Sequence, residues 1–267
     1  MTDLTDPTDL TGRTAIVTGG ATLLAHGVVS ALARAGARVV VADIDEDGGR
    51  AAEKLGDEVV FMHTDVTDDG SVADLVSGAV ERFGGIDIVV NLAATYLDEG
   101  FATARADWLR ALDVNVVSMV EVVRAAHPHL KASEHAAVVN FTSISSKVAQ
   151  TGRWVYPASK AAIVSLTRSM AMDLAPDGIR VNSVSPGWTW SKIMDDLSGG
   201  NRERTDAVAA PFHLTGRVGD GAEVGAVVAF LVSDAASVVT GADWAADGGY
   251  SALGPERAVP AIPQLSE

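Results

Sequence analysis

The sequence predicts a single-domain α/β fold, a doubly wound parallel β-sheet of about seven strands with helices on both faces. Short apolar runs rich in valine and isoleucine alternate along the chain with Ala-, Leu- and Val-rich segments of helical periodicity. The runs are apolar at consecutive residues, which is typical of strands buried on both faces of a parallel sheet. No linker or change of composition marks a second domain, and 267 residues can bury one sizeable core.

The expected elements follow from these runs in order. Strands are expected at residues 14–18, 38–42, 58–63, 86–90, 136–142, 179–184 and 242–246, and helical periodicity is clearest at 28–35, 72–82, 116–126 and 161–174. Gly36 and Gly84-Gly85 follow two of the helical segments, where a left-handed cap ends a helix.

The same pass along the chain gives the expected domain boundaries. Residues 1–10 are expected to form an N-terminal arm, residues 11–253 the domain and residues 254–267 a C-terminal tail. Residues 188–219 are expected to be an irregular insert that acts as a lid on the substrate side, because long irregular loops in compact domains are usually functional.

Composition excludes several functional classes. The chain has no cysteine, so it carries no disulfide framework, thiolate nucleophile or metal site built on sulfur. Its net charge of −15 repels phosphate backbones, which argues against a nucleic-acid partner. The acidic N-terminus lacks the regions of a signal peptide, and no apolar run is long enough to span a membrane. A cytoplasmic protein without membrane contact is therefore expected.

No metal site is expected. His127 and His129 flank a proline at what reads as the broken end of a helix, which is not a ligand motif. They are interpreted as surface or helix-end residues. His26 borders the first βα turn, and the sequence assigns it no role.

The first βα turn has the context of a phosphate-binding loop. Residues 18–25 (TGGATLLA) join an expected strand to an expected helix, where backbone N–H groups can approach a pyrophosphate. Gly19 and Gly20 are present, but Leu23 and Ala25 occupy positions where the usual pattern has glycine. From this turn alone, a nucleotide site and a purely structural turn both remain open.

An acidic residue follows the second expected strand. Asp43 stands 24 residues after Gly19 (43 − 19), about where a carboxylate accepts hydrogen bonds from an adenosine ribose. A carboxylate there repels a 2′-phosphate, and no basic residue lies within 18–25 to receive one, so NAD is favoured over NADP. The acidic residues at 45–47 are interpreted as a solvated loop.

A set of short motifs stands in order along the expected βα units. They are Asp65-Val66, Asp113-Val114-Asn115-Val116, Thr142-Ser143, Tyr156-Pro157-Ala158-Ser159-Lys160, Asn182-Ser183-Val184-Ser185-Pro186-Gly187 and Asp247-Gly248-Gly249. In these motifs and their spacing the sequence resembles the short-chain dehydrogenase/reductase family over residues 10–253, nearly the whole chain. The resemblance implies a Rossmann-type fold and an NAD(P)-dependent alcohol dehydrogenase or ketoreductase, which transfers hydride between nicotinamide and a secondary alcohol or ketone.

The resemblance implies a catalytic tetrad of Asn115, Ser143, Tyr156 and Lys160. Tyr156 and Lys160 are four residues apart, so on a helix they share one face. A free phenol has a pKa of about 10 and is a poor base at neutral pH, but a neighbouring ammonium favours the phenolate. By resemblance, Tyr156 is the acid/base and Ser143 hydrogen-bonds the substrate oxygen. Lys160 also holds the nicotinamide ribose, and Asn115 holds a water of a proton relay.

The resemblance also implies a set of cofactor-binding residues. Gly19 is expected at the pyrophosphate, Asp43 at the ribose and Thr189 at the carboxamide. The full set expected to contact NAD is Gly19, Leu23, Leu24, Asp43, Ile44, Asp65, Val66, Asn91, Ala93, Tyr156, Lys160, Pro186, Gly187 and Thr189.

Two neighbouring loops depart from the family pattern. Leu23 and Ala25 do so in the first turn, and Leu92 and Ala94 do so in the loop after the fourth strand. Either the two loops have repacked together around the same cofactor, or the cofactor site is weakened. The complete tetrad favours the first explanation.

Aromatic residues flank the expected catalytic segment. Trp154 lies two residues before Tyr156, and Trp188 follows Pro186-Gly187 directly. An aromatic-lined cleft favours an apolar, ring-bearing secondary alcohol or ketone, and packing in the core or between subunits is the alternative for the tryptophans. The expected substrate contacts are Ser145, Trp154, Trp188 and Tyr96, with Met194 and Phe212 from the insert.

Two other functions compete with a dehydrogenase. A binding or assembly module on the same scaffold fits a cofactor site weakened at Leu23 and Ala25. A methyltransferase also uses a glycine-rich turn and an acidic residue after the second strand, but it has no use for Ser143, Tyr156 and Lys160. The resemblance further implies a homotetramer, which pairs the helices that carry Asn115 and Tyr156 and the final strands of its subunits.

Overall fold

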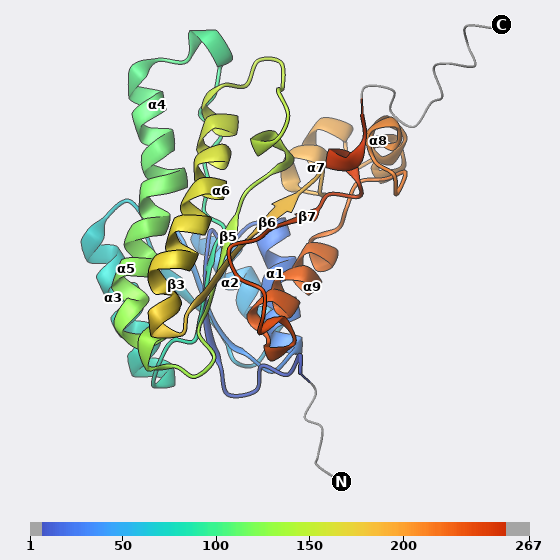
Figure 1. Ribbon diagram of the computed structural model, residues 1–267. Coiled ribbons are helices and arrows are strands. Elements are labelled where there is room, and N and C mark those ends of the chain that lie inside the picture. Colours follow the sequence, from blue (N-terminus) through green and yellow to red (C-terminus); the bar gives the residue numbers. More distant parts are fainter. Residues whose placement is uncertain (1–6, 255–267) are drawn as a thin grey trace, which may run out of the picture.

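Seven parallel strands form the centre of the molecule in the computed structural model, which describes residues 7–254 (Figure 1). In chain order they are β1 (Thr14–Thr18), β2 (Arg38–Asp43), β3 (Val59–His63), β4 (Ile88–Asn91), β5 (Ala137–Phe141), β6 (Arg180–Pro186) and β7 (Asp243–Ala246). Their order across the sheet is β3-β2-β1-β4-β5-β6-β7, and neighbouring strands pair in parallel. The predicted doubly wound fold is confirmed.

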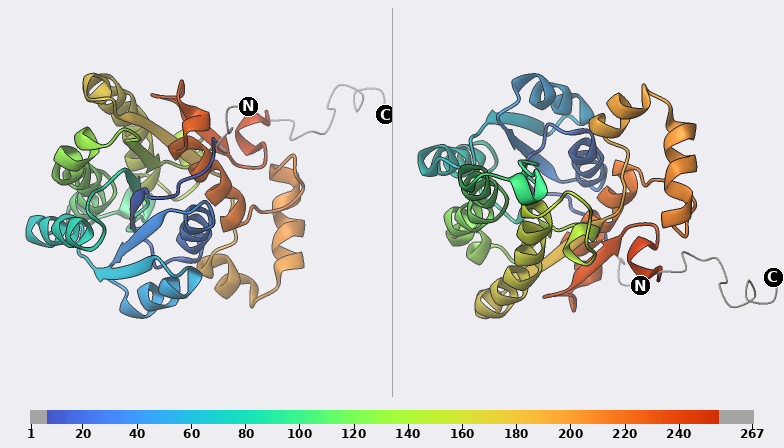
Figure 2. Two further views of the ribbon diagram at one scale, coloured as in Figure 1. Left: turned by 90° about the horizontal axis from the view of Figure 1, so that it is seen from below. Right: turned by 90° about the horizontal axis from the view of Figure 1, so that it is seen from above.

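Helices cover both faces because the strands alternate their side chains between two buried clusters. Ala15 and Val17 of β1 face one cluster, and Ile16 faces the other. The helices of the first layer are α1 (Leu23–Arg34), α2 (Glu46–Ala52) and α9 (Gly221–Val232), and those of the second are α3 (Asp69–Phe83), α5 (Ser118–Ala132) and α6 (Val155–Leu174). The two layers can be followed on opposite sides of the sheet in Figure 2.

Helices α1 and α9 cross at close range through glycine. A Cβ atom on Gly27 would come within 2.1 Å of the Gly221 carbonyl carbon, and one on Gly225 within 2.4 Å of the Gly27 carbonyl oxygen. Larger residues here would separate the helices. This crossing places the start of α9 beside the start of α1, at the end of the sheet where ligands bind in this fold.

Several helices differ from the expected segments. α1 begins at Leu23 rather than at residue 28, because the Thr22 hydroxyl accepts a hydrogen bond from the Ala25 N–H (3.3 Å) and caps it. The segment expected at 116–126 belongs to a longer path, in which α4 (Arg105–Leu112), a π-helical turn (Asp113–Val117) and α5 follow without a break.

The helix break expected at Pro128 is wrong. Pro128 lies inside α5, which continues to Ala132. Ala126 and Leu130 on either side are fully buried, and this packing against the core outweighs the hydrogen bond that proline cannot donate.

The insert at residues 188–219 was expected to be irregular, but much of it is helical. It contains α7 (Lys192–Ser198) and α8 (Arg202–Ala209), which stand apart from the two helical layers (Figures 1 and 2). The side chain of Ser191 caps α7 and that of Asn201 caps α8 by accepting first-turn N–H groups. Short polar residues before each helix therefore define both elements.

The N-terminal boundary of the domain is also corrected. Leu10 is fully buried, its N–H donates to the Ala35 carbonyl (2.7 Å), and the Pro7 carbonyl accepts from the Ala235 N–H (3.0 Å). Residues 7–10 are therefore packed on the domain rather than part of an arm. Of the expected tail, only residue 254 lies within the described residues. Between residues 7 and 254, no helix has both the length and the apolar character that crossing a membrane requires.

Candidate active site

A cavity of about 950 Å³ opens at the carboxyl ends of the strands, where the strand order reverses between β1 and β4. Ligands bind at this switch point in doubly wound sheets, and the volume lies in the range of ligand pockets. Most residues expected to contact cofactor or substrate line it. They are Gly19, Leu23, Leu24, Asp43, Ile44, Asp65, Val66, Ala93, Tyr96, Ser143, Ser145, Tyr156, Lys160, Pro186, Gly187, Trp188 and Thr189.

Gly19 and Asp43 form one end of the cavity. Gly19 has a φ of +64°, and a Cβ atom there would meet the Ala93 backbone at 2.6 Å, so only glycine fits. The Asp43 carboxylate accepts hydrogen bonds from the N–H groups of Ala21 (3.0 Å) and Asp45 (3.0 Å). Each carboxylate oxygen can accept a further hydrogen bond. The structure thus fixes an acceptor at the end of β2, beside the glycine turn.

The two loops that depart from the family pattern pack together. Ala25 is fully buried and belongs to the same apolar cluster as Leu92. The Thr18 hydroxyl accepts hydrogen bonds from the N–H groups of Leu92 (3.3 Å) and Ala93 (3.4 Å), which ties the end of β1 to the loop after β4. Leu23 differs, because it is 47% exposed and lines the cavity. The packing of Ala25 and Leu92 supports the first explanation of the departures.

Tyr156 and Lys160 form the other end of the cavity. They lie one turn apart on α6, and Lys160 Nζ is 5.5 Å from the centre of the Tyr156 ring. Nζ also donates to the Phe141 carbonyl oxygen (2.8 Å).

Burial changes the protonation of this pair. It raises the pKa of the Tyr156 phenol well above its ordinary value, and Tyr96 adds to this, whereas a hydrogen bond with Ser143 and the charge of Arg153 lower it. Burial also lowers the pKa of Lys160 from 10.5 to about 8. The phenol is therefore held neutral, and the ammonium gives up its proton more easily than an exposed lysine.

A chain of hydroxyl groups lies beside Tyr156. Ser143 follows β5 and donates to the Ser145 hydroxyl (3.2 Å), which in turn donates to Gln150 Oε1 (2.7 Å). The Ser143 hydroxyl also accepts from the Ser145 N–H (3.2 Å). These bonds hold Ser143 and Ser145 at the catalytic end, where both were expected.

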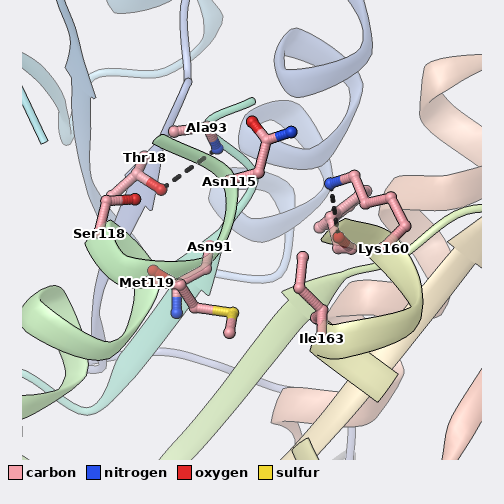
Figure 3. Close-up of a pocket in the computed structure, with 9 residues that line it drawn as sticks. Thr18, Asn91, Ala93, Asn115, Ser118, Met119, Lys160 and Ile163 are labelled. Carbon is pink, nitrogen blue, oxygen red and sulfur yellow. Dashed lines mark hydrogen bonds between the residues drawn. The ribbon is translucent and has the colours of Figure 1, made fainter. Parts of the chain in front are cut away.

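Asn115 lies in the π-helical turn, and its amide holds the loop after β4. Its Oδ1 accepts from the Thr95 N–H (2.7 Å), and its Nδ2 donates to the Thr95 carbonyl (3.1 Å) and the Ser159 hydroxyl (3.1 Å). With Lys160 it borders a narrow space that is too small for a water molecule (Figure 3). The water relay assigned to Asn115 stays a prediction.

Three expected contact residues lie outside the main cavity: Asn91, Trp154 and Phe212. Asn91 borders the narrow space of Figure 3, and its Nδ2 donates to Asn140 Oδ1 (3.0 Å). Trp154 is 53% exposed, and its ring packs edge-on against Phe101 at 5.8 Å. Trp154 therefore does not line the cavity, and its ring is engaged with Phe101 instead.

Asp98, which sequence reasoning missed, fixes the start of α6. Its carboxylate accepts hydrogen bonds from the N–H groups of Trp154 (2.9 Å), Tyr156 (2.8 Å) and Gly100 (3.0 Å). Burial raises the pKa of Asp98, and the backbone N–H groups outweigh it and lower the pKa overall. Trp154 precedes the helix without a capping side chain of its own, so the loop after β4 supplies the cap.

Tyr96 comes from the same loop and covers the Tyr156 ring. The two rings stack at 4.6 Å with an angle of 25°, and their hydroxyl oxygens are 3.5 Å apart. Tyr96 is 52% exposed and lines the cavity. Its place beside the Tyr156 phenol supports the expected substrate contact.

Trp188 lines the cavity on the insert side, and a buried histidine holds its backbone. The Trp188 N–H donates to His213 Nε2 (3.3 Å), and His213 Nδ1 lies 3.0 Å from the Ala209 carbonyl oxygen. This pair of contacts requires the neutral ring with its proton on Nδ1. Phe212 packs against the Trp188 ring at 5.6 Å and stands behind it.

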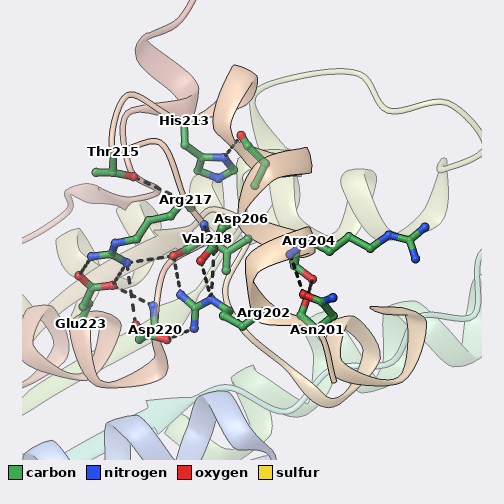
Figure 4. Close-up of polar contacts among 12 residues, drawn as sticks. Asn201, Arg202, Arg204, Asp206, His213, Thr215, Arg217, Val218, Asp220 and Glu223 are labelled. Atoms are coloured by element: carbon green, nitrogen blue, oxygen red, sulfur yellow. Dashed lines mark hydrogen bonds and ion pairs between the residues drawn. The ribbon is translucent and has the colours of Figure 1, made fainter. Parts of the chain in front are cut away.

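A cluster of ion pairs fixes the insert to the domain (Figure 4). Arg202 on α8 pairs with Asp206 (3.1 Å) and Asp220 (2.6 Å) and donates to the Val218 carbonyl (3.1 Å). Because Asp220 caps α9, these contacts join α8 to the main body. Met194 of α7 lines the cavity, as expected of the insert.

His26 and His127 make structural contacts. His26 Nε2 lies 3.3 Å from the Gly48 carbonyl oxygen, which links α1 to α2. His127 pairs with Asp177 at 2.8 Å. Within residues 7–254, no group of three or more His, Asp or Glu side chains could hold a metal ion.

The long cleft ends at a tyrosine–lysine pair and lies where doubly wound folds bind ligands, and comparisons with known proteins identify the class of protein. A family model described as enoyl-(acyl carrier protein) reductase matches residues 19–251. The cis-4-hydroxycyclohexanecarboxylate dehydrogenase of Sinomonas cyclohexanicum is 36% identical over 252 residues, which are 90% of this chain and 97% of the relative. The L-fucose dehydrogenase of Oryctolagus cuniculus is 35% identical over 254 residues (92% and 88%).

Two further matches also cover about nine tenths or more of both chains. The 3-alpha-(or 20-beta)-hydroxysteroid dehydrogenase of Mycobacterium tuberculosis is 35% identical over 245 residues (90% of each chain). The crystal structure of gox2181 has a TM-score of 0.83 and 34% identity, and the match covers 92% of this chain and 98% of that one. The chain therefore belongs to the short-chain dehydrogenase/reductase family, as the motifs predicted, and is an oxidoreductase acting on CH–OH groups.

The cavity fits the nicotinamide cofactors that dehydrogenases of this family use. Gly19 leaves open a turn that a Cβ atom would fill, and the α1 N-terminus and Asp43 lie beside it. The lining continues from there to Lys160 and Thr189. These residues offer a helix N-terminus for phosphates and polar groups for two riboses.

Proposed function

We propose that the protein is an NAD-dependent dehydrogenase that oxidises a ring-bearing, largely apolar secondary alcohol or reduces the matching ketone. The observation that carries this proposal is the continuous cavity of about 950 Å³, which holds Asp43 at one end and Ser143, Tyr156 and Lys160 at the other. The ring preference is supported by Tyr96 and Trp188 in the lining. It is also supported by the relatives, whose names concern cyclohexane, fucose and steroid alcohols.

The preference for NAD over NADP rests on charge at the ribose end. Asp43 and Asp45 both line the cavity there, and a 2′-phosphate beside them would bring like charges together. Residues 18–25 contain no lysine or arginine that could compensate. The hydroxyl groups of an unphosphorylated ribose, in contrast, can donate to Asp43.

In the proposed mechanism Tyr156 moves the proton of the substrate oxygen. Bound nicotinamide supplies the hydride acceptor or donor. In reduction the neutral phenol, which burial favours, donates its proton to the oxygen that becomes a hydroxyl. In oxidation the phenolate accepts that proton, and the Lys160 ammonium favours the phenolate. The Ser143 hydroxyl proton, which bonds to Ser145 without substrate, turns to the same oxygen and stabilises its developing charge.

Neighbouring residues hold in position the two side chains that meet the substrate oxygen. Ser143 is held by Ser145, and the start of α6, which carries Tyr156, is held by Asp98. Because neither holding contact depends on a ligand, the two groups that meet the substrate oxygen, Ser143 and Tyr156, are in place before the substrate arrives.

The proposal includes a cytoplasmic homotetramer. On the side of α4, α5 and α6 several apolar side chains are exposed: Phe101, Leu109, Val117, Trp154 and Met172. β7 is the edge strand of the sheet, and Trp244 on it is 36% exposed. Burial of both surfaces against further copies of the chain is favourable. Light scattering measures the number of chains in the assembly.

The test combines cofactor binding with turnover. NAD⁺ and NADP⁺ are titrated by calorimetry into the wild type and into Tyr156→Phe, after bound nucleotide has been excluded. Alcohol panels at alkaline pH are then followed by NADH absorbance. We expect NAD⁺ to bind more tightly than NADP⁺ in both proteins, and turnover to fall by at least about a thousandfold in the variant.

Three results would count against the proposal in different ways. Near-normal turnover in Tyr156→Phe rejects the assigned mechanism. Tighter binding of NADP⁺ rejects the interpretation of Asp43 but leaves the enzyme class. Absence of binding by either nucleotide makes Leu23 the decisive residue of the turn and favours the binding-module alternative.

A further inference from the structure

One cation at the catalytic end of the cavity has no partner. Arg153 lines the cavity with Tyr156 and Trp188, and its charge acts on the Tyr156 phenol. Among residues 7–254, no side chain or carbonyl pairs with the Arg153 guanidinium; its one hydrogen bond is made by the backbone, from its N–H to the Gln150 carbonyl (3.2 Å).

The other cations of the cavity wall are all engaged. Lys160 donates to the Phe141 carbonyl (2.8 Å), Lys192 pairs with Asp196 (2.9 Å), and Arg110 donates to the Thr67 hydroxyl (3.0 Å). Arg153 therefore differs from its neighbours in an acidic protein of net charge −15, where carboxylate partners are abundant.

The carboxylates of the cavity lie away from Arg153. Within the described part of the chain, the acidic residues that line it are Asp43, Asp45 and Asp65, and they belong to the ends of β2 and β3. Around Ser143 and Tyr156 the lining is neutral or positive, and Asp98, the carboxylate bound to the neighbouring Trp154 N–H, lies outside the lining and is engaged by three backbone N–H groups. A negative ligand group is thus repelled from the ribose end and attracted to the substrate end.

The backbone presents Arg153 in a fixed place. Its N–H is bound to Gln150, whose side chain accepts from Ser145, and the next N–H, that of Trp154, is bound to Asp98 (2.9 Å). The exposed side chain starts from a segment whose backbone is held by these hydrogen bonds, so its own rotamers are the main freedom that a ligand must order.

We infer that Arg153 binds a carboxylate on the substrate, so that the substrate class is a ring-bearing secondary alcohol with a carboxylate away from its carbinol carbon. The planar guanidinium fork matches a carboxylate with two parallel hydrogen bonds. The ring lies between the aromatic side chains of Tyr96 and Trp188, and the carbinol meets Ser143 and Tyr156. This inference rests on the proposed dehydrogenase function.

The test uses matched acids and amides. Turnover with NAD⁺ is measured for 3- and 4-hydroxycyclohexanecarboxylic acids, for their primary carboxamides and for cyclohexanol, in the wild type and in Arg153→Met and Arg153→Lys. Arg204→Met is the control, because Arg204 lies outside the cavity and points away from the polar cluster of the insert (Figure 4). Binding of unreactive cyclohexanecarboxylate to the NAD-loaded proteins is measured by calorimetry.

We expect the wild type and Arg204→Met to prefer the better acid over its amide by about tenfold or more in kcat/KM, as one charge-assisted bidentate contact provides. Arg153→Met is expected to lose this preference and to bind cyclohexanecarboxylate about tenfold more weakly, with an unchanged Kd for NAD⁺. Arg153→Lys keeps the charge but not the fork, and should retain part of the preference.

The outcomes separate this inference from the proposed function. Turnover of cyclohexanol without any preference for acids overturns the role of Arg153 and leaves the dehydrogenase standing. Equal acid preference in Arg153→Met and the wild type overturns it as well. Absence of turnover with every alcohol counts against the proposed function, while the binding of cyclohexanecarboxylate still decides whether Arg153 holds a carboxylate.

Discussion

Replacing Lys160 by methionine is expected to stabilise the folded protein while it abolishes turnover. Lys160 is 3% exposed, and burial lowers its pKa from 10.5 to about 8. At 1.36 kcal/mol for each pKa unit, the buried ammonium costs about 3 kcal/mol at pH 7. Methionine has a similar length without charge, and the loss of the hydrogen bond to the Phe141 carbonyl costs about 1 kcal/mol. The net gain is about 2 kcal/mol.

The pH dependence of this gain follows from the direction of the shift. The pKa of Lys160 is lower in the folded protein than in the unfolded chain, so between about pH 8 and 10.5 the unfolded state binds more protons. Wild-type stability therefore rises with pH across this window, and the cost is fully present only below it. The advantage of Lys160→Met should shrink as the pH rises from 7 to 10.

The measurement is unfolding by guanidinium chloride, followed by tryptophan fluorescence at equal protein concentration at pH 7 and at pH 10. Taking the difference between variant and wild type cancels the titration of other groups. A variant that is less stable than the wild type at pH 7, or a difference that does not change with pH, would refute the view that burial of this ammonium is a cost to folding. Lys160→Gln is the control for loss of charge with a polar group retained.

Two further predictions concern the residues that hold the ends of the cavity. Asp98→Ala should lower the free energy of unfolding by about 1–3 kcal/mol and kcat by about tenfold, because the start of α6 loses its carboxylate cap, and Asp98→Asn should recover part of both. The pKa of Asp98 is lowered in the folded protein, so its carboxylate contributes to the free energy of unfolding above the ordinary Asp pKa. Denaturation curves should show this contribution disappearing as the pH falls below that value. Identical acid sensitivity of Asp98→Asn and the wild type would contradict this. Asp43→Ser should raise the affinity for NADP⁺ relative to NAD⁺ by about tenfold or more, because a repelling charge is removed. The ratio of the two Kd values by calorimetry checks it, and an unchanged ratio assigns the discrimination to another residue.

Much of the fold could be predicted because parallel strands buried on both faces carry their own signal. β1 is TAIVT, and its five residues are all buried, so the apolar run and the strand coincide. The helix ends were harder, because caps rather than apolar periodicity decide them. Thr22, Ser191 and Asn201 each cap a helix, and each is a residue type that the sequence displays openly.

The candidate site could be predicted where function depends on residue type at a fixed spacing. Tyr156 and Lys160 on one helical turn, and Asp43 after β2, are such cases. Asp98 could not be found this way, because its partner Trp154 is 56 residues away and no local pattern connects them. Trp154 shows the opposite case: it is two residues from Tyr156 in the sequence, but it packs on Phe101 and does not line the cavity.

The loop after β4 connects the two ends of the cavity, and this gives its departures from the family pattern a physical meaning. Leu92 is buried with Ala25 behind the cofactor turn, and its N–H is bound to Thr18. A few residues later the same loop carries Tyr96, which stacks on Tyr156, and Asp98, which caps α6. The start of a loop that holds Tyr156 must be anchored, and a buried leucine at position 92 packs against more apolar surface than a smaller residue would. The bulk at Leu92 and Ala25 therefore agrees with a site in which Tyr156, the proposed catalytic tyrosine, is held by the loop that borders the proposed cofactor turn.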